Sequence, residues 1–472
     1  MKKSNLFKSV AWYGVGNIIA RSMTLILLPL YSNLISTKEF GNYSLLVSVY
    51  TIIATVYQFG MSSALNKFYT EEPDEKKKKI IFSTILNSIV VLGIILTVVT
   101  TLFSTSIVTF VFGSKNFSPL LILLIGSLFF ETINFYIILL LKTKEMPKET
   151  VVYSVAGAIV NLGLNILFVF YFRWSISGII LAQLLSGIIL FFISLHVIKG
   201  TYIFIVDKKI LLTIVVFSLP LLAGSLFTAL TNVADRFIIN IFMSKDDVGI
   251  YSFVYRIALL MNVFVVSFAM AWNPHSVKQY FRNNYSESYG KTLSHFLAGG
   301  MLLFLFVSLF IKILFETKVF GTFILNPIYK PGLSAFPFIM AGYFFNGIST
   351  YYAVYPYVSN KTYQLLITDF IALSLNIGLN YLLIPKLGLM GAAISTAAAF
   401  FFGALYLFFI SKNKLKINYE KKEMSLIIIG GIVVYILGTF VDSFYLNIIL
   451  LSSYSLLLYK VCNIQLFSWQ KD

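Results

Sequence analysis

The chain alternates long apolar runs with short polar segments over its whole length of 472 residues. A transmembrane helix needs about 20 consecutive, mainly apolar residues, and most of these runs reach that length. The pattern therefore predicts an all-α polytopic membrane protein with about fourteen transmembrane helices. The expected spans are residues 10–35, 42–66, 80–103, 119–141, 151–172, 176–198, 210–242, 248–272, 292–315, 331–357, 363–384, 389–410, 424–441 and 444–461.

Two halves of the chain repeat one another. The pattern Asn-x-Gly-Leu-Asn occurs at residues 161–165 and again 215 positions later at 376–380, and Gly41 matches Gly249 at an offset of 208. Further pairs at the offset of 215 are Phe129 and Phe344, Phe130 and Phe345, Ile133 and Ile348, and Tyr136 and Tyr351. Because the repeat holds an even number of spans, both copies have the same orientation, related by an axis along the membrane normal.

The repeat predicts a division of the chain into four parts. We expect a first six-helix lobe at residues 1–198 and a second at residues 210–411, in a parallel pseudo-twofold arrangement. Residues 199–209 are expected to form an interfacial connector between the lobes, and residues 412–472 two additional carboxyl-terminal transmembrane helices. Such lobes can rock against each other about a central cleft and so expose it to each side of the membrane in turn.

Composition and charge agree with a membrane protein. The chain is 58% hydrophobic and 12% charged, with a net charge of +17. Of its 36 Lys and Arg residues, 25 lie in segments on the side of the termini and eight on the opposite side. The positive charge therefore indicates topology, with both termini in the cytoplasm, and does not indicate nucleic acid binding. With one cysteine and three scattered histidines, we expect no disulfide, no metal site and no bound cofactor.

Charged residues inside the spans are the candidates for function, because each costs about 2.5 to 3.5 kcal/mol to insert unless it faces protein or water. The six charges are Arg21, Glu131, Asp235, Arg236, Arg256 and Asp369. In the first span, helical spacing puts Asn17, Thr24 and Tyr31 on the face of Arg21, and in the seventh span Thr231 lies on the face of Asp235.

These residues allow two interpretations. In the functional one they line the cleft: the arginines bind phosphate oxygens through forked donors, and Asp235, Glu131 and Asp369 couple transport to a proton or sodium gradient or to the membrane potential. In the other, three arginines and three carboxylates neutralise one another inside the protein. The paired asparagines of the fifth and eleventh spans are expected to bridge helices instead of contacting substrate.

Several motifs resemble those of Wzx-type polysaccharide flippases, which belong to the multidrug, oligosaccharidyl-lipid and polysaccharide exporter superfamily. They occur in the family's order and cover essentially the whole chain. The motifs are Leu219-Pro220, Ala234-Asp235-Arg236-Phe237-Ile238, Val248-Gly249-Ile250-Tyr251-Ser252, Tyr255-Arg256, Ala271-Trp272-Asn273-Pro274, residues 376–380, Leu383-Ile384-Pro385-Lys386 and Gly388-Leu389-Met390-Gly391-Ala392-Ala393.

The resemblance implies a MATE-like fold in the bacterial cytoplasmic membrane and a function without catalysis. It implies alternating access that moves an undecaprenyl-pyrophosphate-linked oligosaccharide outward for O-antigen or capsule synthesis. The partners that it implies are membrane lipid and, for assembly of the polysaccharide, a glycan polymerase and other assembly proteins. Arg21, Arg236 and Arg256 match the contributors to the family's electropositive cavity.

Two other functions stay open. A cation-coupled multidrug antiporter of the same superfamily has the same fold, although Arg21 on the cleft face favours an anionic substrate. A membrane glycan polymerase or acyltransferase is also polytopic. Such an enzyme usually needs a large outer loop or a His, Asp or Glu site, whereas the longest outer loop here, residues 316–330, contains no histidine.

Overall fold

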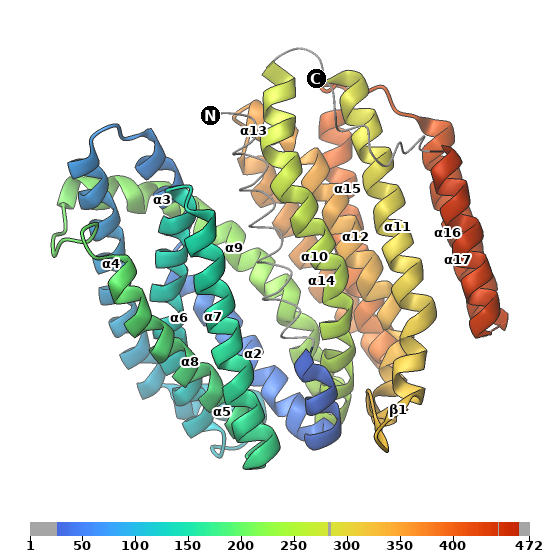
Figure 1. Ribbon diagram of the computed structural model, residues 1–472, viewed down its shortest axis with the longest axis horizontal. Helices are drawn as coiled ribbons and strands as arrows, with labels where there is room; N and C mark the ends of the chain where they lie inside the picture. The colour runs from blue at the N-terminus through green and yellow to red at the C-terminus, as the bar shows by residue number, and fades with distance from the viewer. Residues whose placement is uncertain (1–25, 282–284, 442, 462–472) are drawn as a thin grey trace. The chain divides into compact units, whose positions relative to one another are not determined.

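The computed structural model describes residues 26–281, 285–441 and 443–461, and these are almost entirely helical (Figure 1). Residues 26–34 are helical and precede α2. The elements that follow are α2 (Thr37–Gln58), α3 (Met61–Glu71), α4 (Glu75–Leu102), α5 (Ser104–Phe112), α6 (Ser118–Thr143), α7 (Pro147–Asn165), the π-helical turn η1 (Ile166–Tyr171), α8 (Ser175–Val197), α9 (Lys208–Phe242), α10 (Lys245–Phe281), α11 (Ser286–Glu316), β1 (Lys318–Val319), β2 (Thr322–Phe323), the 3-10 helix η2 (Pro327–Ser334), α12 (Phe336–Tyr352), α13 (Val354–Val358), α14 (Tyr363–Leu387), α15 (Leu389–Lys412), α16 (Lys421–Val441) and α17 (Phe444–Val461).

The prediction of an all-α polytopic membrane protein is confirmed. Within the described residues, 12 helices are long and apolar enough to cross a bilayer. The predicted tenth span is α12, a helix of 17 residues extended at its ends by η2 and α13. Most of the predicted first span lies outside the described residues. Many large apolar side chains point away from the protein, as expected for helices that contact lipid.

The predicted second span, residues 42–66, is divided between two helices. Ser36 and Glu39 form a capping box at the start of α2, which fixes where that helix begins. The helix ends because Phe59 and Gly60 both have positive φ angles, of 48° and 66°. A new helix, α3, then starts at Met61 and continues toward the loop before α4.

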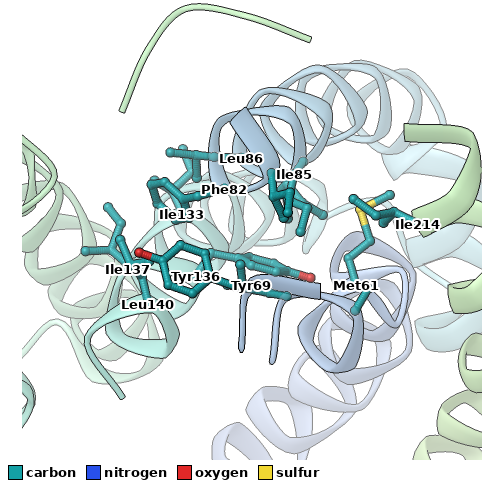
Figure 2. Packing of buried hydrophobic residues seen from close by; sticks show 14 of the residues in the cluster. Met61, Tyr69, Phe82, Ile85, Leu86, Ile133, Tyr136, Ile137, Leu140 and Ile214 are labelled. Carbon is teal, nitrogen blue, oxygen red and sulfur yellow. The ribbon is translucent and has the colours of Figure 1, made fainter. Parts of the chain in front are cut away.

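By its internal contacts the chain divides into two compact units, one up to Ser252 and one from Phe253 onward. The core of the first unit includes side chains from α3, α4, α6 and α9. Figure 2 shows Met61 and Ile214 at one end of this cluster and Ile137 and Leu140 at the other. Here α9 packs against α2, α3 and α4, although the sequence predicted it as the first span of the second lobe. The predicted lobe boundaries stay a prediction.

The beginnings of α2 and α10 cross closely within the first unit. A Cβ atom on Gly41 would lie 1.9 Å from the Lys245 carbonyl oxygen, and one on Gly249 would lie 1.9 Å from the Thr37 carbonyl oxygen. The Thr37 hydroxyl also donates a short hydrogen bond to Asp246 beside this crossing. Gly41 and Gly249 are equivalent positions in the sequence repeat, so the two helices meet through matching atoms.

The second unit is built around two groups of helices. One consists of α12, α14 and α15, and in the other α11 packs against α16 and α17. An aromatic cluster joins α10, α11 and α12: Trp272 stacks on Tyr351 with 4.7 Å between ring centroids, and its indole N–H donates to the Tyr351 carbonyl oxygen at 3.1 Å. A short hairpin of β1 and β2 follows α11.

Candidate functional site

Asp235 is the most enclosed charged side chain of the described residues, with 0% of its surface exposed. The Tyr251 hydroxyl donates to one of its carboxylate oxygens at 2.7 Å, and Arg236 donates to the other from its guanidinium at 3.0 Å and its backbone N–H at 2.8 Å. The Arg236 guanidinium also donates to the Asn232 carbonyl oxygen at 2.5 Å. Asp235 and Arg236 thus form an internal ion pair, as the neutralising interpretation expects.

Glu131 lies half-buried at the contact of three helices. It comes from α6 and accepts a short hydrogen bond from the Tyr50 hydroxyl of α2. The Gln183 side chain of α8 also lies within hydrogen-bonding reach of the Glu131 carboxylate. All of these partners are neutral side chains, so the arrangement holds either a carboxylate or a carboxylic acid.

A chain of hydrogen bonds links the first predicted span to the backbone of Gln183. The Tyr31 hydroxyl donates to the Asn165 side-chain oxygen at 2.7 Å, and the Asn165 amide donates to the Asn161 side-chain oxygen at 3.1 Å. The Asn161 amide donates to the Ser186 hydroxyl at 3.2 Å, which in turn donates to the Gln183 carbonyl oxygen at 2.9 Å. Polar side chains from the first span, α7 and α8 therefore connect to the backbone of Gln183, the residue whose side chain approaches Glu131.

The second asparagine pair has a similar role in the second unit. Asn376 of α14 donates to the Thr396 hydroxyl of α15 at 3.2 Å, and the Asn380 amide donates to the Asn376 side-chain oxygen at 2.9 Å. Both asparagine pairs join a helix to its neighbour by side-chain hydrogen bonds. The expectation that these pairs bridge helices is confirmed, and that they do not contact substrate stays a prediction.

The structure separates the predicted site residues into several groups. Asn17, Arg21 and Thr24 lie outside the described residues. Tyr31 and Thr231 are 3% and 1% exposed, and the Thr231 hydroxyl donates to the Phe227 carbonyl oxygen at 2.9 Å. Their assignment to a cleft stays a prediction.

Arg256 and Asp369 belong to the second unit, on α10 and α14, and both are half-buried. Among the described residues, no group of three or more His, Cys, Asp and Glu side chains has the arrangement of a metal site.

Sequence reasoning missed Tyr50, Gln183 and Ser186. A signal for the latter two was present, because Gln183 and Ser186 interrupt an otherwise apolar run in the sixth span. Tyr50 gave none, since tyrosine is frequent throughout this chain. Only the packing of α2 against α6 and α8 shows that these side chains converge on Glu131.

Comparison with known proteins adds to this geometry. The sequence pattern of the family described as "Polysaccharide biosynthesis protein" matches residues 6–280. An uncharacterized membrane protein of Methanocaldococcus jannaschii is 22% identical to this chain. The alignment is 483 residues long and covers 95% of this chain and 92% of that protein.

Solved structures show the same fold over most of the chain. The lipid II flippase MurJ, in an inward closed conformation, matches with a TM-score of 0.75 and 18% identity, covering 95% of this chain and 98% of that one. An inward-facing MATE family transporter of the MOP superfamily matches with a TM-score of 0.71 and 16% identity, covering 84% of this chain and 94% of that one. The chain therefore shares the fold of these two solved structures.

Proposed function

Since this chain belongs to the family of polysaccharide biosynthesis proteins, we propose that it is a flippase for a lipid-linked oligosaccharide. Its substrate is an oligosaccharide repeat unit on undecaprenyl pyrophosphate, which it moves from the inner to the outer leaflet of the bacterial cytoplasmic membrane by alternating access. The product enters synthesis of a surface polysaccharide such as O-antigen or capsule. Both termini lie in the cytoplasm, and a glycan polymerase and other assembly proteins act beside it.

The family match over residues 6–280 is the observation that carries this proposal. The likeness to the lipid II flippase MurJ supports a lipid-borne substrate, because the same fold serves such a substrate there. The protein supplies binding and movement and no bond is made or broken, so we propose a function without enzymatic activity. Extracted protein should accordingly leave its glycan donor chemically unchanged.

The substrate pyrophosphate needs positively charged partners, for which Arg21, Arg236 and Arg256 are the candidates. Arg236 already donates to Asp235 at 3.0 Å, so part of its donor capacity is committed to that carboxylate. Arg21 has no second charged residue on its predicted span. We therefore assign Arg21 the main contact with phosphate, through the two parallel N–H donors that a guanidinium provides. Asn17, Thr24, Tyr31 and Thr231 line the same path.

Export by Arg21 variants tests this proposal. Proteoliposomes are loaded with a fluorescent oligosaccharide on undecaprenyl pyrophosphate, and the fraction that reaches the outer leaflet is followed with a membrane-impermeant quencher. Arg21→Ala should abolish flipping at unchanged protein abundance. Arg21→Lys should keep only part of the flipping activity, because its ammonium group lacks the two parallel N–H donors of a guanidinium. Arg173→Ala, outside the predicted spans, is the control. Normal flipping by Arg21→Ala would disprove the phosphate contact.

Glu131 is the candidate that we favour for coupling to an ion gradient, with Asp235 and Asp369 as the other carboxylates. Its neutral partners, Tyr50 and Gln183, suit a group that gains and loses a proton in each cycle. Moving one charge across the membrane is worth about 2.3 kcal/mol per 100 mV. Flipping by Glu131→Gln should no longer respond to a gradient of protons or sodium or to the membrane potential. Glu316→Gln, in an exposed ion pair with Lys330, is the control.

A multidrug antiporter is the second candidate, because the MATE family transporter has the same fold. This function requires an organic cation as substrate instead of a phosphate. Cells that express the protein should then extrude cationic dyes, and Arg21→Ala should not impair the extrusion. Dye extrusion without any flipping of lipid-linked oligosaccharide would favour the antiporter.

A further inference from the structure

The segment between α8 and α9 exposes four apolar side chains in a row. Residues 202–207 form no helix, and within them Ile203, Phe204, Ile205 and Val206 are 40%, 91%, 42% and 44% exposed. Contiguous exposed apolar side chains indicate contact with another apolar phase or partner. The sequence predicted this segment to be an interfacial connector, and the structure shows what holds it.

Polar side chains of α4 hold the segment beside that helix. Figure 1 shows the segment as a loop between α8 and α9. The Ile203 N–H donates to the Ser83 hydroxyl at 2.9 Å. The Ile205 carbonyl oxygen, at the tip, accepts from the Asn87 amide at 2.9 Å. The Asp207 N–H then donates to the Thr84 hydroxyl at 3.1 Å. The chain thus descends along α4 as far as Asn87 and returns.

The tip of this path lies well inside the apolar part of α4. The charged start of α4 ends at Lys79, and its apolar run begins at Ile80. Asn87 lies seven residues further, which corresponds to about 10 Å along the helix axis. Non-helical backbone is tolerated at such depth only where its polar groups are satisfied by protein. Ser83, Thr84 and Asn87 are 0%, 0% and 8% exposed, and they supply these partners.

Basic residues flank the apolar tip. Lys199 precedes the segment and Lys208 and Lys209 follow it, and all three are exposed. The Tyr202 hydroxyl donates to the Asn87 side-chain oxygen at 2.7 Å, so the first residue of the segment is also held against α4. Lysines next to an inserted apolar segment are attracted by the anionic lipids of the cytoplasmic leaflet.

We propose that residues 202–207 form a re-entrant segment that inserts Phe204 among the acyl chains of the cytoplasmic leaflet, where Lys208 and Lys209 bind the phosphate of an anionic phospholipid. The occupant is membrane phospholipid, since the charge of the lysines and the apolar surface before them match its two parts. The location rests on the proposed orientation with cytoplasmic termini, and the binding itself is independent of transport.

Fluorescence quenching at position 204 tests the insertion. Phe204→Cys, in a Cys462→Ser background, is labelled with bimane and reconstituted with brominated phosphatidylglycerol or brominated phosphatidylcholine at equal mole fraction. Brominated lipid should quench the label strongly and aqueous iodide weakly, with Lys199→Cys as the water-exposed control and Ile429→Cys as the lipid-exposed one. Strong quenching by iodide, or no quenching by either reagent because a protein covers the site, would overturn the insertion.

Comparison of the two lipids tests whether Lys208 and Lys209 bind an anionic headgroup. Brominated phosphatidylglycerol should quench about twofold more than brominated phosphatidylcholine, and the double variant Lys208→Gln, Lys209→Gln should remove this preference while quenching by phosphatidylcholine persists. Equal quenching by both lipids in the labelled protein that keeps Lys208 and Lys209 would refute binding of an anionic headgroup. Asn87→Ala should lower quenching by both lipids, and unchanged quenching would exclude α4 as the support.

The orientation has its own control. In intact cells, a membrane-impermeant thiol reagent should label Lys318→Cys and not Lys199→Cys. The reverse pattern would place the segment in the outer leaflet and would refute the proposed orientation, whereas the quenching results would still report whether Phe204 inserts.

Discussion

Replacement of Gly249 by alanine should be among the most damaging single-methyl changes in this protein. The added Cβ would lie 1.9 Å from the Thr37 carbonyl oxygen, whereas ordinary contact begins at 3.4 Å. The difference requires α2 and α10 to separate by about 1.5 Å at their crossing. A backbone carbonyl cannot turn aside as a flexible side chain does, so the helices themselves must move.

The expected cost follows from this displacement. Overpacking by one methyl group costs typically about 1–3 kcal/mol, and we expect the upper part of that range because the opposing atom is backbone. Separation also stretches the hydrogen bond from Thr37 to Asp246. Gly41→Ala should cost as much, since its Cβ would lie 1.9 Å from the Lys245 carbonyl oxygen. The double variant should lose less than the sum, because one separation relieves both contacts.

Thermal unfolding of the purified protein in one detergent measures these losses. Gly163→Ala and Gly378→Ala are matched controls, because a Cβ atom at either glycine meets nothing within 4 Å. Both Gly41→Ala and Gly249→Ala should melt several degrees below the controls. Equal melting temperatures for all four variants, or strictly additive losses in the double variant, would show that α2 and α10 do not cross as described.

Three further predictions concern the buried polar side chains. Tyr251→Phe removes the 2.7 Å donor to Asp235 and should cost about 1.5–3 kcal/mol in thermal unfolding, whereas Tyr445→Phe, at a site 77% exposed, should cost nothing measurable. Asn376→Ala breaks the bridge to α15 and should cost about 0.6–1.7 kcal/mol by the same measurement; an unchanged melting temperature would argue against the bridge. Thr231→Cys, in a Cys462→Ser background, should react with a small aqueous thiol reagent at a rate that depends on substrate, while Ile428→Cys stays unlabelled; equal rates at the two sites would remove Thr231 from the path.

Hydropathy predicted most of the fold because each membrane helix must by itself satisfy its backbone and be apolar over the bilayer thickness. The exceptions are local. The first helix of the predicted span 42–66 ends at Gln58, because Phe59 adopts a positive φ angle, which is uncommon for a phenylalanine and is not predicted by hydropathy. Gly60 was the available signal, but a glycine inside a membrane span is common.

The candidate site was predicted less completely. Glu131 was recognised as an intramembrane acid because it is a charge inside a predicted span, and helical spacing identifies which residues share a face. Spacing does not identify the neighbouring helix that the face meets. The donation from Tyr50 and the reach of Gln183 depend on how α2, α6 and α8 pack, which no single helix encodes. The link from Tyr31 to Asn165 spans 134 residues of sequence and was missed for the same reason.

The buried polar residues of this chain differ in the kind of partner they have. That difference distinguishes residues that hold the backbone in place from residues that are candidates for ion coupling. Ser83, Thr84 and Asn87 bind the backbone of residues 203–207, because an irregular segment at membrane depth needs such partners. Among the described residues, the hydrogen-bond partners of Glu131 are instead the side chains of Tyr50 and Gln183. A carboxylate inside a membrane span is costly and therefore marks a candidate functional residue. For this reason a role in ion coupling is a stronger hypothesis for Glu131 than a role in transport is for the three polar residues of α4.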